Sequence, residues 1–101
     1  MKFNVLKRKD KLIVKISGEL DHHNSRTVRE SVDIEIKSGN VKTLIFDFSN
    51  LTFMDSSGIG IIMGRFHLMS MYGGRVVIEK APEYVKKIIY MSGLKDVVDI
   101  A

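Results

Sequence analysis

Two adjacent serines, Ser56 and Ser57, stand between Asp55 and Gly58, where a strand-like run gives way to a helix-like run. A hydroxyl at such a junction can cap the helix, act as a nucleophile or accept a phosphoryl group. As a cap, the side chain of Asp55 or Ser56 would accept backbone N–H bonds and stabilise the helix by about 1 kcal/mol. The choice between these roles depends on which residues could assist the hydroxyl.

Ser56 lacks the partners of a hydrolase nucleophile. The nucleophile elbow has the form G-x-S-x-G, and here Met54 stands where its first glycine is required. The one downstream histidine, His67, is expected on the same helix, facing away. The chain has no cysteine, which excludes thiolate nucleophiles, thiolate metal sites and disulfides. We therefore expect no catalytic residue.

The glycines and histidines give weak signals for a bound ligand. Gly58, Gly60 and Gly64 follow the pattern G-x-G-x-x-x-G, which departs from the dinucleotide fingerprint, and no lysine–hydroxyl pair completes a Walker A loop. A small nucleotide-binding module is thus the weaker alternative, and we expect the glycines to allow a close approach of the sheet or of another protein. His22 and His23 are adjacent, so their side chains diverge, and the chain has only one further histidine. We expect a polar loop there, with no metal and no cofactor.

Phosphorylation is the role that Ser56 could fill without an internal partner. A phosphoryl group adds a charge of about −2, and the positive end of a helix dipole tolerates it. Asp55 and Asp21 are expected nearby, so a partner that pairs with Asp21 and closes over Ser56 would lose its fit. Like charges about 4 Å apart repel by roughly 4 kcal/mol at an effective dielectric of 20, which is about a thousandfold in affinity.

The elements that must position these residues alternate along the chain. The apolar patterns predict strands over 3–6, 12–17, 41–48, 75–79 and 97–100, and helices over 25–39, 57–71 and 81–93. The order β-β-α-β-α-β-α-β predicts a single α/β domain over 1–101, with a mixed, mostly parallel sheet of about five strands and three helices. Polar loops over 18–25 and 49–55 would lie at one edge of the sheet, where such folds place their function.

The expected helices carry recognisable faces. Val28, Val32 and Ile36 form the inner stripe of the first helix. Thr27 with Glu30 has the spacing of a capping box, although Asn24 or Ser25 could also start the helix. In the second helix a broad apolar face is formed by Ile59, Ile62, Met63, Phe66 and Met69.

A second side of the second helix carries Ile61, Leu68 and Tyr72, which are either core or an exposed docking patch. The methionines at 63, 69, 71 and 91 fall at helical spacing and are expected to be mostly core.

The charge of the chain is local. The net charge is +4, and residues 1–11 carry five basic side chains against Asp10, so the other ninety residues sum to zero. Nucleic-acid binding needs a concentrated basic face, and we expect none. No run approaches the roughly 18 apolar residues of a membrane span, and the N-terminus has no signal peptide. We expect a soluble cytoplasmic protein without membrane contact.

Three motifs carry a family resemblance. "GELDHH" at 18–23, "FMDSSGIGIIMGR" at 53–65 and "MSGL" at 91–94 resemble the anti-sigma factor antagonists of the STAS domain family, and most closely the sporulation type. The resemblance covers nearly the whole chain. It departs at the C-terminus, because the familiar antagonists continue into a further helix after the last strand.

The resemblance implies a binding protein that switches partners and is not an enzyme. In that family the unphosphorylated antagonist binds an anti-sigma factor that is also a serine kinase, and a sporulation sigma factor is released. The kinase uses ATP to phosphorylate the serine that corresponds to Ser56, and a manganese- or magnesium-dependent serine phosphatase removes the phosphate. ATP and metal therefore belong to the partners. An antagonist in a general stress-response sigma pathway is the alternative.

The resemblance also implies a binding surface. Asp21 is similar to the family's aspartate that meets an arginine of the kinase. Ser57 supports Ser56, and Gly58 lies where the contact would be close. We add Asp55 and Ile61 to this expected surface.

Overall fold

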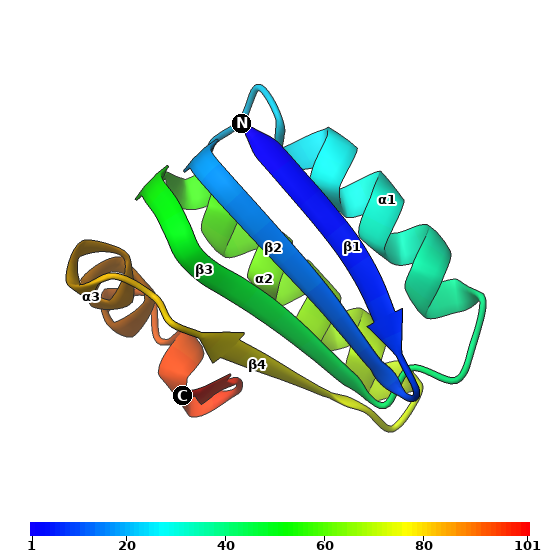
Figure 1. Ribbon diagram of the computed structural model, residues 1–101. Coiled ribbons are helices and arrows are strands. Elements are labelled where there is room, and N and C mark those ends of the chain that lie inside the picture. Colours follow the sequence, from blue (N-terminus) through cyan, green and yellow to red (C-terminus); the bar gives the residue numbers. More distant parts are fainter.

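The computed structural model of the protein describes residues 1–101 and contains five strands and three helices (Figure 1). In chain order they are β1 (Lys2–Arg8), β2 (Lys11–Leu20), α1 (Ser25–Lys37), β3 (Thr43–Met54), α2 (Ser56–Met71), β4 (Arg75–Glu79), α3 (Glu83–Met91) and β5 (Asp99–Ile100), with a short 3-10 turn over Leu94–Asp96. The predicted α/β fold and its element order are confirmed.

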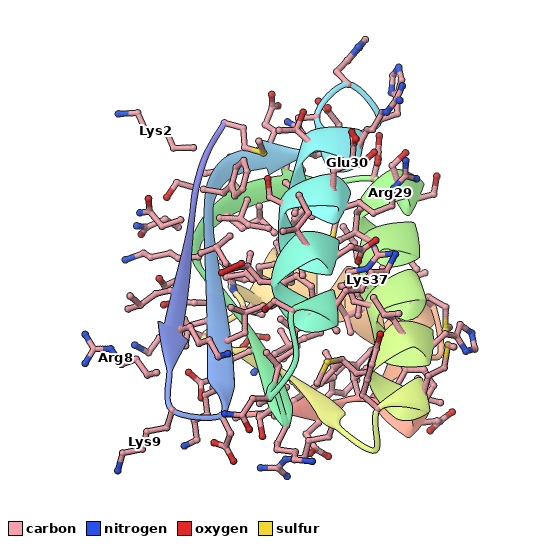
Figure 2. All side chains as sticks on the ribbon, turned by 90° about the vertical axis from the view of Figure 1, so that its right-hand side faces the viewer. Lys2, Arg8, Lys9, Arg29, Glu30 and Lys37 are labelled. Carbon is pink, nitrogen blue, oxygen red and sulfur yellow. The ribbon has the colours of Figure 1, made fainter.

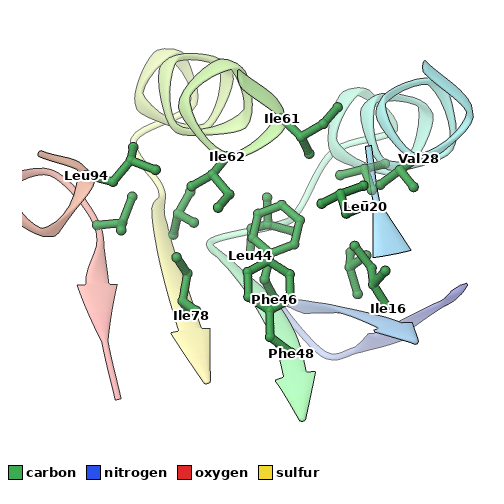
Figure 3. Packing of buried hydrophobic residues seen from close by; sticks show 14 of the residues in the cluster. Ile16, Leu20, Val28, Leu44, Phe46, Phe48, Ile61, Ile62, Ile78 and Leu94 are labelled. Carbon is green, nitrogen blue, oxygen red and sulfur yellow. The ribbon is translucent and has the colours of Figure 1, made fainter. Parts of the chain in front are cut away.

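The five strands form one sheet in the order β1-β2-β3-β4-β5. β1 pairs with β2 antiparallel, and every later pair is parallel. Right-handed crossovers that always step in the same direction place successive helices on the same face of the sheet. α1 and α2 accordingly lie side by side over one face (Figures 1 and 3).

The two central strands are longer than the sequence predicts. Residues 18–20 and 49–54, expected as loops, extend β2 and β3, and they pair with each other through two register shifts. The polar residues of this stretch lie on exposed positions, whereas Leu51 and Met54 are buried. The extension carries the ends of β2 and β3 beyond β4, whose pairing with β3 stops at Asp47 and Glu79.

The core lies between the sheet and the helices. It is one cluster of 22 buried apolar residues, in which Phe46 and Phe48 are the largest fully buried side chains (Figure 3). The stripe predicted for α1 is confirmed, since Val28, Val32 and Ile36 are all buried. Burial of apolar surface of this kind stabilises the fold by roughly 25 cal/mol per Å².

Several local predictions for the helices can be compared with the structure. The helix start at Thr27 is wrong and the alternative start is confirmed, because α1 begins at Ser25 after Asn24, whose side chain does not cap the helix. Gly39 and Gly93 follow α1 and α3 with φ of +98° and +85°, a backbone conformation typical of the residue after a helix C-terminus. Met69 is fully buried, but Met71 and Met91 are 80% and 83% exposed, so their assignment to the core is wrong.

The basic residues near the N-terminus project outward. Lys2, Arg8 and Lys9 point away from the helices along the β1–β2 hairpin (Figure 2). Charged side chains on an edge strand discourage pairing with other chains. None of the three helices combines the length and apolar character needed to cross a bilayer.

The face of the sheet away from the helices carries charged side chains as well. Asp47 lies on this face, and its pKa lies below its ordinary value. Burial alone would raise the pKa, but the hydrogen bonds with Ser49 and the nearby charges of Lys80 and Lys15 together outweigh burial.

Candidate functional site

The ends of β2 and β3 bring two loops together at one edge of the sheet. Leu20 and Met54, the last residues of the two strands, are aligned in the register, and the N–H of Asp55 donates to the carbonyl of Leu20 at 3.3 Å. Asp21 and Asp55 each follow one of these aligned residues. The structure therefore brings the two aspartates to one corner, as the sequence predicts for neighbouring parallel strands.

Asp55 is the cap of α2. Its backbone is extended, and its Oδ1 accepts a hydrogen bond from the N–H of Ser57 at 2.8 Å. Its carbonyl accepts from the N–H of Gly58 at 3.0 Å. Because Asp55 supplies the cap, the hydroxyl of Ser56 is not needed for it.

Ser56 is the first residue of α2 and is exposed. Its hydroxyl makes no hydrogen bond within the chain, whereas Ser57 behind it is half-buried. The two adjacent serines thus differ in accessibility, and Ser56 is the one that a modifying enzyme could reach.

The loop after β2 is held by its own polar side chains. Oδ1 of Asp21 accepts from the N–H of His23 at 2.9 Å, and the N–H of Asp21 donates to Oδ1 of Asn24 at 3.0 Å. The side-chain amide of Asn24 in turn donates to the carbonyl of Glu19 at 2.8 Å. These hydrogen bonds hold Asp21 in the loop directly after β2, where its side chain is half-buried.

His22 connects the two loops. Its Nδ1 lies 3.8 Å from Oδ2 of Asp55, and its ring lies against that of His23 with centroids 3.9 Å apart. The sequence alone gave these histidines no role beyond a polar loop, because the contact with Asp55 depends on the register between β2 and β3.

At Gly58 the structure supports one of the two expected roles, a close approach of the sheet. Gly58 is buried, and a Cβ at this position would overlap the Cγ of Met54 and lie 3.4 Å from Leu20. The glycine is therefore required by packing against the sheet. Gly60 and Gly64, in contrast, would place a Cβ in open space.

Of the two alternatives for Ile61, core or docking patch, the structure supports the core. Ile61 is 4% exposed and turns towards α1, while Ile62 turns towards the sheet (Figure 3). A helix packed against both a sheet and a neighbouring helix buries two of its sides, which explains the second apolar side. Leu68 is half-buried against the core, and only Tyr72 of the expected patch is well exposed, at 47%.

A buried ion pair that sequence reasoning missed joins the two helices. Nε of Arg65 lies 2.8 Å from Oδ1 of Asp33, and the two side chains are 9% and 21% exposed. Burial lowers the pKa of Arg65, the charge of Asp33 opposes this, and Arg29 (Figure 2) lowers it further. A lone arginine within an apolar helix was the available signal. The pair links α2 to α1.

Comparison with known proteins agrees with this geometry. The sequence pattern of the STAS domain matches residues 2–101, nearly the whole chain. The chain belongs to the STAS domain family. Within the family it is similar to the anti-sigma factor antagonists: it is 40% identical over 89 residues to the anti-sigma F factor antagonist of Paenibacillus polymyxa, covering 88% of this chain and 76% of that protein.

Solved structures of antagonists share this STAS fold. The anti-sigma factor antagonist SpoIIAA in its unphosphorylated form superposes with a TM-score of 0.89 at 32% identity, covering 99% of this chain and 88% of that one. The Bacillus cell fate determinant SpoIIAA in the phosphorylated form gives a TM-score of 0.80 at 31% identity, covering 99% and 91%. The anti-sigma factor antagonists that this chain resembles are regulators and not enzymes.

Proposed function

We propose that the protein is a phosphorylation-controlled antagonist of a sporulation anti-sigma factor. The unphosphorylated form binds an anti-sigma factor that has serine kinase activity, and the sigma factor is released. Phosphorylation of Ser56 weakens this binding, and a serine phosphatase reverses it. These binding and phosphorylation steps take place in the cytoplasm, and the partner proteins use the ATP and the metal.

The single observation that carries this proposal is the state of Ser56. Its side chain is exposed, its hydroxyl is unbonded, and it lies beside the Asp21–Asp55 corner. Because Asp55 caps α2, a phosphoryl group on Ser56 removes no hydrogen bond on which the helix depends. The existence of a phosphorylated form of SpoIIAA, with a similar fold, supports the same reading.

The effect on binding is electrostatic. Asp21 and Asp55 already present negative charge at the corner, and a basic group of the partner would pair with Asp21. A phosphoryl group adds a charge of about −2 at the same place, and it also adds bulk. The partner surface that closed over a small hydroxyl would then meet a large anion, so affinity falls while the fold is kept.

Phosphorylation mapping tests the proposal directly. The purified protein is incubated with the cognate anti-sigma kinase and ATP, and the modified residue is identified by mass spectrometry. We expect modification of Ser56, its loss in Ser56→Ala, and its retention in Ser57→Ala. Modification at another residue, or none, would count against the proposal.

Binding measurements test the electrostatic part. In titration calorimetry, Ser56→Asp is expected to bind the anti-sigma factor at least tenfold more weakly, whereas Ser56→Ala keeps the affinity. Asp21→Ala is expected to weaken binding as well, and Asp10→Ala, at the distant β1–β2 turn, serves as its control. If Ser56→Asp and Asp21→Ala both bind with unchanged affinity, the surface around Asp21, Asp55 and Ser56 does not contact the anti-sigma factor.

A second pathway is the alternative. The chain is also 28% identical over 99 residues to the anti-sigma-B factor antagonist of Bacillus subtilis, covering 97% of this chain and 88% of that protein. An antagonist in a general stress-response pathway would use the same corner. Competition between the two classes of anti-sigma factor for the purified protein decides between them, and we expect the anti-sigma F class to win.

A further inference from the structure

The contact between His22 and Asp55 has a consequence for the phosphorylated form. Nδ1 of His22 lies 3.8 Å from Oδ2 of Asp55, and Ser56 is the next residue in the chain. The imidazole therefore contacts the residue that directly precedes the proposed phosphorylation site. None of the binding steps proposed above uses it.

We propose that His22 is the chain's own counter-ion for a phosphoryl group on Ser56. This inference rests on the proposed modification of Ser56 and names a positioning residue for it. The protonated imidazole would turn from the carboxylate of Asp55 towards the phosphoryl oxygens, which carry more charge. The ring of His23 lies beside that of His22, and the two planes are tilted by 38°.

The charges around His22 favour this role. Asp55 faces it from the start of α2, and Asp21 precedes it in the same loop. In the first turn of α1, Arg26 is engaged with Glu30 through an ion pair of 3.2 Å. Arg26 is thus paired with Glu30, and His22 is the protonatable side chain that contacts Asp55, the residue next to Ser56.

The electrostatic consequence can be measured. The second ionisation of phosphoserine occurs near pH 6, where histidine is partly protonated. A nearby imidazolium favours the dianion, so it lowers the pH at which the phosphate titrates. The side chain of His22 is 69% exposed, so the expected displacement is modest, about 0.2 to 0.5 of a pH unit.

The experiment uses the full chain with phosphoserine placed at position 56 by semisynthesis, so that no kinase is required. Phosphorus NMR follows the titration of the phosphate in the wild-type background and in His22→Gln. We expect the midpoint to rise by about 0.2 to 0.5 of a pH unit in His22→Gln. The difference should shrink in 1 M salt, where the Debye length falls to about 3 Å.

His67→Gln is the matched control. His67 is exposed on the same helix, eleven residues after Ser56, which is roughly 16 Å along the axis. The midpoint is expected to stay at the wild-type value in this variant. Identical midpoints in wild type and His22→Gln, or an equal rise in His67→Gln, would overturn the assignment. Failure of the kinase to modify Ser56 would instead overturn the proposed function, because the semisynthetic protein does not depend on it.

Discussion

Along α2, the side that faces the sheet and α1 differs sharply from the side that faces solvent. Ile62 and Met69 are fully buried on the inner side, and Gly58 is in contact with Met54. On the outer side, Ser56 and Gly60 are exposed and make no packing contacts of this kind. One helix thus carries both a packed surface and an open one.

The glycines of α2 differ between its inner and outer sides. A glycine inside a helix is less favourable than alanine by up to about 1 kcal/mol, because it loses more backbone freedom on folding. At Gly58 the close packing of Met54 explains why a glycine is present. At Gly60 and Gly64 no contact within the chain explains it. Under the proposed function, the outer glycines allow the backbone of a partner to come close to α2.

Breaking the ion pair beneath α2 is expected to have the largest effect on stability. Asp33→Ala leaves the charge of Arg65 buried without a partner, and we expect the free energy of unfolding to fall by about 3 kcal/mol. Urea denaturation measures it. The double variant with Arg65→Met should recover part of the loss, and a fall below about 0.5 kcal/mol in Asp33→Ala would show that the pair is not important for stability.

Adding a methyl group on the inner side comes next. Gly58→Ala places a Cβ against the Cγ of Met54, so the side chain or the helix must move, and we expect a loss of about 2 kcal/mol. Denaturant unfolding gives the value. The companion variant Met54→Ala/Gly58→Ala removes the overlap, so its loss should be less than the sum of the two single losses. Strict additivity would contradict the packing argument.

Removing the cap tests the boundary between the two sides. Asp55→Ala loses the hydrogen bond to the N–H of Ser57, and we expect the protein to lose about 1 kcal/mol of stability. Ser56→Ala, one residue further on, should change it by less than about 0.3 kcal/mol, because its hydroxyl is unbonded. Thermal unfolding of the two variants side by side provides the measurement. Equal losses would mean that Ser56 shares the capping role.

The sequence predicts the parts of this arrangement that depend on local pattern. The element order and the inner stripe of α1 follow from apolar periodicity, and the meeting of Asp21 with Asp55 follows from neighbouring parallel strands. The exposure of Ser56 follows from its place at a helix start. These features need only the spacing of residues along one element or the alternation of elements.

The features that were missed depend on contacts between elements. The extension of β2 and β3 carries polar residues whose exposure becomes visible only once the two strands are paired. The sequence of α2 alone does not show whether Ile61 is exposed, because the residue is buried by the neighbouring helix α1. The pairing of Arg65 with Asp33 joins positions 32 residues apart. Periodicity within a single element contains no information on such partners.

The outer glycines give the smallest change in stability and the clearest separation of folding from binding. Gly60→Ala and Gly64→Ala add a methyl group that meets nothing within 4 Å, so each should raise the free energy of unfolding by about 0.5 to 1 kcal/mol. If a partner approaches this side closely, the same substitutions weaken binding to the anti-sigma factor by about tenfold or more. Calorimetric titration and urea denaturation on the same samples measure both quantities. A variant that is stabilised and binds normally would show that the open side of α2 lies outside the interface, and would confine the contact to the corner around Ser56.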